Sequence, residues 1–92
     1  MKQSSFGKYL KEKRLAASLS QGDVAQALGY TSPQFVSNWE RDLSKPPLKI
    51  IYQLSVMYHI SREEITSILM DEHEKLLRSA FDEALRERSV SR

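Results

Sequence analysis

The segment from Ser20 to Gly29 carries the local signals that begin and end a short helix. Ser20 is a favoured N-cap residue, and Asp23 stands three positions later, where its side chain completes a variant of the capping box. Val24, Ala25 and Leu28 then follow at the spacing of one buried helix face. Gly29 suits the left-handed conformation that stops a helix. The segment therefore predicts a short, amphipathic helix.

A second short helix is predicted over residues 33–41. Serine is a favoured cap and proline a favoured first helical residue, so Ser32-Pro33 indicates its start. Its apolar residues share one side: Phe35, Val36 and Trp39. Its polar residues share the other, at i, i+3, i+4 and i+7: Gln34, Ser37, Asn38 and Arg41.

The rest of the chain also has helical patterns. We expect a first helix, capped by Ser4 or Ser5, to about residue 18, and another over residues 47–58. Ser61 with Glu64 forms a capping box, and residues 62–88 contain neither Gly nor Pro. They predict either one long helix or a break near Met70. The expected domains are residues 4–69, a C-terminal helix at 70–88 and a frayed tail at 89–92.

These residues resemble the Cro and lambda-repressor-like helix-turn-helix family, also called the XRE family. The matching positions are Ser20-Gln21, Val24-Ala25, Leu28-Gly29, Val36-Ser37, Trp39-Glu40-Arg41 and Pro46, with Tyr58 to Ser61 and Glu64-Ile65 downstream. The resemblance implies an all-α, five-helix domain with an additional or extended C-terminal helix. The chain departs from the family in a turn one residue longer after Gly29. It also has Asp42 where glycine is common, and aspartate tolerates the left-handed conformation.

The resemblance implies that helix 33–41 enters the major groove of double-stranded operator DNA. The implied base contacts are Thr31, Pro33, Gln34, Ser37 and Asn38, and the implied phosphate contacts are Gln21, Arg41, Ser44, Lys45 and Lys49. An amide such as that of Gln34 offers adenine a matched donor and acceptor. The alternative is that these polar residues are the solvated face of a surface helix. A structural ion pair between Arg14 and Glu40 is also implied.

The C-terminal helix has more apolar surface than an isolated helix leaves in water. The residues concerned are Leu76, Leu77, Ala80, Phe81, Ala84 and Leu85. They either fold back on the domain or pack against another chain, and we expect a homodimer interface. The alternative is an antitoxin-type protein that binds a small protein partner through this helix as well as operator DNA.

Composition restricts the class of protein further. The chain has 92 residues and no cysteine, which excludes thiol chemistry and thiolate metal sites. Residues 1–50 hold eight basic and four acidic side chains, and this net charge of +4 suits an anionic partner. His59 and His73 have no partners at ligand spacing, so we expect no metal, no cofactor and no enzymatic activity. No apolar run is long enough for a membrane span or signal peptide, so we expect a cytoplasmic protein. The resemblance to the XRE family implies that it is a regulator of transcription, and we expect a repressor.

Overall fold

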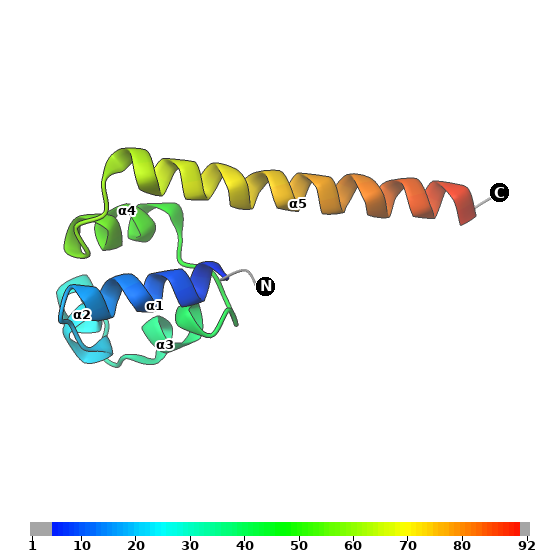
Figure 1. Ribbon diagram of the computed structural model, residues 1–92. Helices are drawn as coiled ribbons and strands as arrows, with labels where there is room; N and C mark the ends of the chain where they lie inside the picture. Colours follow the sequence, from blue (N-terminus) through cyan, green and yellow to red (C-terminus); the bar gives the residue numbers. More distant parts are fainter. Residues whose placement is uncertain (1–4, 91–92) are drawn as a thin grey trace. The chain divides into compact units, whose positions relative to one another are not determined.

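The computed structural model of the chain describes the backbone of residues 5–90 and the side chains of residues 5–87. Its helices are α1 (Phe6–Ala16), α2 (Gln21–Leu28), α3 (Gln34–Glu40), α4 (Leu48–Met57) and α5 (Arg62–Val90), as Figure 1 shows. No strand occurs among the described residues, and the predicted all-α class is confirmed. The chain divides into two compact units after Ser61, one holding α1 to α4 and the other α5. Each unit is described by itself.

The first two helices begin with the side-chain caps that the sequence predicts. Ser5 Oγ accepts the backbone N–H of Lys8 at 3.1 Å, whereas Ser4, the other predicted cap, lies outside the described residues. At α2, Ser20 Oγ accepts the N–H of Asp23, and the Asp23 carboxylate accepts the N–H of Ser20, both at 2.9 Å. The hydrogen bond from the Ser20 backbone lowers the pKa of Asp23. The predicted capping box is confirmed.

Helix α3 begins one residue later than the sequence predicts, so the expected range of 33–41 is corrected to Gln34–Glu40. The carbonyl oxygen of Pro33 accepts the first intrahelical hydrogen bond, from Ser37 N–H, which makes Pro33 the N-cap residue. Proline has no side-chain acceptor, and the hydroxyl of Ser32 instead accepts Gln34 N–H at 3.3 Å. Arg41 is the C-cap residue rather than part of the helix.

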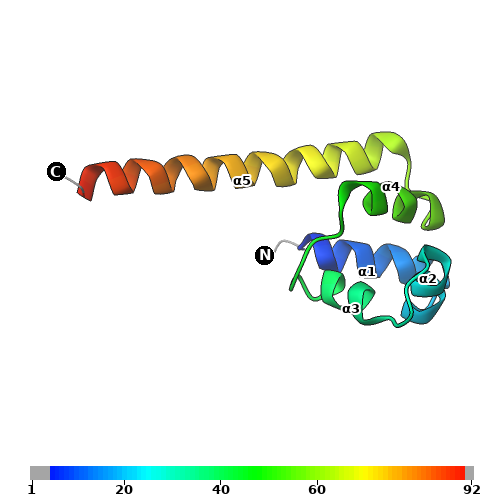
Figure 2. The same cartoon turned by 180° about the vertical axis from the view of Figure 1, so that it is seen from behind.

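A single apolar core holds α1 to α4 together. The buried hydrophobic side chains that form this core are Phe6, Leu10, Val24, Ala25, Val36, Trp39, Ile51, Leu54, Tyr58 and Ile60. Helix α3 lies beside α1, and α2 lies beside α3 (Figures 1 and 2). Each of the four helices contributes one short apolar face to this core.

Gly7 lets the start of α1 lie against the end of α3. Its backbone N–H donates to Asp42 Oδ1 at 2.9 Å. A Cβ built on Gly7 would lie 2.5 Å from the carbonyl oxygen of Trp39 and 2.8 Å from that of Glu40. Only a residue without a side chain fits this approach of two helix backbones.

Each helix of the first unit is followed by a residue in the left-handed conformation. After α2 this is Gly29, with φ of 88°. After α1, α3 and α4 the residues are Ser18, Asp42 and His59, with φ of 60°, 61° and 58°. The expected tolerance of Asp42 for this conformation is thus confirmed, and the φ of Ser18 accounts for an end of α1 two residues before the predicted one.

The second unit is one uninterrupted helix (Figure 1). Of the two alternatives for residues 62–88, the single long helix is correct, and no break occurs near Met70. Ile65 is buried, whereas the six residues of the predicted interface are all exposed. Arg78 and Glu74 form a surface ion pair at 2.7 Å, which supports the helix between successive turns. Of the predicted frayed tail, Ser89 and Val90 belong to α5, and Ser91 and Arg92 lie outside the described residues.

Candidate nucleic-acid interface

The polar face of α3 presents two amide side chains that are already joined to each other. Gln34 Nε2 donates to Asn38 Oδ1 at 3.0 Å, across one helical turn. Gln34 is exposed, while Asn38 and Ser37 are half-buried. The bond does not use the Gln34 carbonyl oxygen or the Asn38 NH₂ group, which remain as an acceptor and a donor. Such a pair matches the donor and acceptor on the major-groove edge of adenine.

The opposite face of α3 is anchored in the core. Val36 and Trp39 are 1% and 4% exposed. A short helix has little stability of its own, so this burial is what gives its polar face a defined position. The arrangement is the one that a DNA-reading helix needs, with one side rigidly held and the other free to meet base edges.

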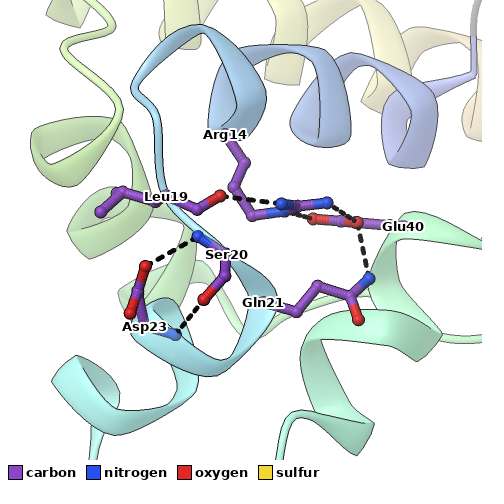
Figure 3. A network of polar contacts seen from close by, with 6 residues as sticks. All are labelled: Arg14, Leu19, Ser20, Gln21, Asp23 and Glu40. Carbon is purple, nitrogen blue, oxygen red and sulfur yellow. Dashed lines mark hydrogen bonds and ion pairs between the residues drawn. The ribbon is translucent and has the colours of Figure 1, made fainter.

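A buried ion pair ties the same helix to α1 (Figure 3). Arg14 Nε and Nη2 donate to the two carboxylate oxygens of Glu40 at 2.6 and 3.0 Å, and the side chains are 7% and 3% exposed. The third guanidinium nitrogen donates to the carbonyl oxygen of Leu19 at 2.8 Å. The hydrogen bond to Glu40 raises the pKa of Arg14. The pair expected between Arg14 and Glu40 is formed, with bidentate geometry.

Gln21 belongs to this network, which the sequence does not indicate. Its Nε2 donates to Glu40 Oε1 at 2.9 Å, so the first residue of α2 is linked to the last residue of α3 (Figure 3). Its side chain is half-buried. One amide proton of Gln21 is therefore committed to Glu40, and a phosphate contact has only the second proton and the backbone N–H available.

The remaining predicted contact residues lie on the surface before and after α3. Thr31 and Pro33 are exposed in the turn that precedes the helix. Exposed residues in and around the loop that follows it are Arg41, Ser44, Lys45 and Lys49. Pro46 is buried and anchors that loop. All of these predicted contact residues come from the segment between the end of α2 and the first turn of α4.

An aromatic cluster beside the polar face was only partly predicted. Phe35 was expected on the apolar side of the helix, but it is 52% exposed. Its ring centroid lies 4.9 Å from that of Tyr30 in the turn and 6.4 Å from that of Trp39. The three-to-four spacing correctly placed Phe35 near Trp39, but a seven-residue helix buries a face too narrow to cover both rings.

Together, a capped helix, a turn and a second helix with one anchored and one polar face define a helix-turn-helix DNA-binding domain. The family model for helix-turn-helix proteins matches residues 10–65, more than half of the chain. The chain therefore belongs to the lambda-repressor-like, or XRE, helix-turn-helix family of DNA-binding transcriptional regulators. No match was found among curated proteins or among solved structures.

Over the described residues, no group of His, Asp and Glu side chains is placed to hold a metal ion. No helix in the same part of the chain is both long and apolar enough to span a membrane.

Proposed function

We propose that this protein is a sequence-specific repressor that binds double-stranded operator DNA as a homodimer. The observation that carries the proposal is the joined Gln34–Asn38 pair on a helix whose other face is held by Val36, Trp39 and the Arg14–Glu40 ion pair. Repression is the simplest consequence of such binding, because a protein that occupies DNA excludes others from it and needs no additional activating surface.

The proposed sequence preference comes from α3 and the turn before it. Gln34 and Asn38 together read one adenine, and this bidentate contact contributes about 1–3 kcal/mol of discrimination. Ser37 offers a hydroxyl to a base or to the backbone, and Thr31 and Pro33 approach neighbouring bases from the turn. The alternative is that these residues are only the solvated face of a surface helix. Such a face does not require Gln34 and Asn38 to be hydrogen-bonded to each other.

The proposed affinity comes from phosphates on both sides of that contact. Arg41, Lys45 and Lys49 are exposed cations within nine residues of sequence, with Ser44 beside them as a hydroxyl donor. Gln21 contributes its second amide proton or its backbone N–H at the start of α2. Phosphate contacts of this kind fix the position of the domain on DNA and carry no sequence information themselves.

The proposed dimer forms through α5. Its apolar face consists of Leu76, Leu77, Ala80, Phe81, Ala84 and Leu85, and Phe81 is 68% exposed. A dimer places two copies of α3 on half-sites about 34 Å apart, one turn of DNA, so the operator should be an inverted repeat. The apolar face would also suit a small protein partner, as in antitoxins, and this is the second candidate function.

Selection of bound sequences from a pool of random duplex DNA tests the proposal. We expect an enriched inverted repeat that contains A·T pairs in each half-site. Failure to enrich any sequence would refute sequence-specific binding, and an enriched single half-site would refute the homodimer.

Sedimentation of two variants tests the interface. Phe81→Glu places a charge on the apolar face of α5, and Ser79→Glu places the same charge two residues away, on the opposite face. We expect wild type and Ser79→Glu to be dimers and Phe81→Glu to be a monomer with weaker operator binding. A monomeric wild-type protein that copurifies with a small toxic partner would favour the antitoxin-type function instead. A dimeric Phe81→Glu variant would place the interface elsewhere, with the exposed Leu15 of α1 as the next candidate.

A further inference from the structure

Phe35 is an unusual residue to find exposed on α3. It is the second residue of the helix, and about half of its surface is accessible. The ring does not point freely into water, because Tyr30 lies against it at a centroid distance of 4.9 Å with an interplanar angle of 35°. Trp39, which is buried, lies behind it at 6.4 Å. The exposed part of the ring is thus held in one place by two aromatic neighbours.

Helix geometry sets this ring beside the amide pair. Phe35 directly follows Gln34 and precedes Asn38 by three positions, and residues three apart lie next to each other on a helix surface. Phe35 therefore borders the Gln34–Asn38 pair on the side that adjoins the turn and Tyr30. If the two amides meet base edges, the ring of Phe35 enters the same groove.

The apolar group that the base edges expose in the major groove is the C5-methyl group of thymine, and an aromatic ring can pack against it. We propose that Phe35 contacts this methyl group in the base pair next to the one that Gln34 and Asn38 read. The inference rests on the proposed function and names a specificity-determining residue for it. Two aromatic neighbours restrict the ring before DNA arrives, so the contact costs little conformational entropy.

The first experiment uses the wild-type protein and the sequence selected from random DNA. Each thymine of a half-site is replaced in turn by deoxyuridine, which removes the methyl group and leaves base pairing unchanged. We expect one position at which affinity falls about fourfold, the effect of one buried methylene-sized group at ~0.8 kcal/mol. No loss at any thymine would overturn the inference while leaving the selected site, and hence the proposed function, intact. A pool that yields no selected site would instead overturn the proposed function itself.

The second experiment assigns the methyl group to Phe35. Phe35→Ala should lose affinity for the thymine site and bind the thymine and deoxyuridine sites equally. Val56→Ala is the control, because Val56 is an apolar residue on α4 that is also more than half exposed, and this variant should keep the fourfold difference. A Phe35→Ala variant that still distinguishes thymine from deoxyuridine would overturn the inference. If this variant is too unstable to assay, Phe35→Leu replaces it, and a reduced difference is then expected.

5-Methylcytosine presents the same C5-methyl group as thymine. A third experiment therefore tests whether the contact depends on the methyl group alone or on the thymine base. At the sensitive position the A·T pair is replaced by G·C, with and without 5-methylation of the cytosine. Tighter binding of the methylated form would support a contact that reads the methyl group in either pyrimidine. Equal binding of the two forms would count against a contact with the methyl group itself.

Discussion

Gly7 and Gly22 both occupy the second position of a helix, and their surroundings differ in a way that predicts opposite effects of the same substitution. A Cβ at Gly7 would lie 2.5 and 2.8 Å from two backbone carbonyl oxygens of α3 and 2.7 Å from Asp42 Oδ1. A Cβ at Gly22 would have as its nearest neighbour the Ser20 hydroxyl, at 3.7 Å, which is an ordinary contact.

The expected magnitude for Gly7→Ala follows from these distances. Backbone oxygens cannot rotate away, so the end of α3 has to retreat by roughly 0.5 Å from a closely packed position, at a cost of about 1–3 kcal/mol. The retreat also weakens the hydrogen bond from Gly7 N–H to Asp42, which contributes about 0.5–1.5 kcal/mol. Alanine recovers at most about 1 kcal/mol through its helix propensity. Gly7→Ala should therefore lower the free energy of unfolding by about 1–3 kcal/mol.

Urea and thermal unfolding of the two variants measure the difference. A loss of 1 kcal/mol corresponds to a fall of about 4–8 °C in the melting temperature of a domain of this size. Gly22→Ala has no comparable steric cost and should instead gain about 0.4–1 kcal/mol, because alanine restricts the unfolded chain. A Gly7→Ala variant as stable as wild type would refute the reasoning, since it would mean that the two helices do not approach this closely.

Four further predictions concern the ion pair, the base contacts, a phosphate contact and the cap of α2. Arg14→Ala should lower the free energy of unfolding by about 3–5 kcal/mol, because it strands a buried carboxylate. An unchanged melting temperature would contradict this. Gln34→Ala and Asn38→Ala should each weaken binding to the selected site by about 1–3 kcal/mol without loss of stability. Arg41→Ala should weaken binding to all sequences and reduce the slope of log K against log salt by about 0.9, so an unchanged slope would exclude a phosphate contact. The pKa of Asp23 is lowered, so its stabilising effect should be complete above the ordinary value of about 3.9 and lost as the pH falls through the lower native value. An NMR titration of Asp23 with a midpoint at or above the ordinary value would disprove this.

Short-range signals account for what the sequence predicts well. The capping box of Ser20 and Asp23 and the stop at Gly29 each depend on residues within one or two turns, so the limits of α2 follow from the sequence alone. The start of α3 was misplaced because both Ser32 and Pro33 are favoured near a helix start. The cap is the residue whose carbonyl oxygen accepts the first intrahelical hydrogen bond, and in the structure this is Pro33.

Long-range contacts account for what the sequence does not predict. The hydrogen bond from Gln21 to Glu40 spans 19 residues, and the one from Gly7 to Asp42 spans 35. Neither has a local pattern that could indicate it. Phe35 was assigned to the buried face by its spacing from Trp39, but whether a residue at the edge of such a face is covered depends on the neighbouring helices.

The left-handed residues that follow α1, α3 and α4 have a consequence for the amount of this regulator in a cell. A residue other than glycine held in this conformation costs of the order of 1 kcal/mol, within a total stability that is typically only 5–15 kcal/mol. Ser18 and His59 are held in this way, whereas Asp42 gains a hydrogen bond to α1 from its position. A change of 1–2 kcal/mol alters the steady-state abundance of a protein several-fold, because proteases remove the unfolded fraction. Relief of the strain at Ser18 or His59 is therefore expected to raise the abundance of the protein.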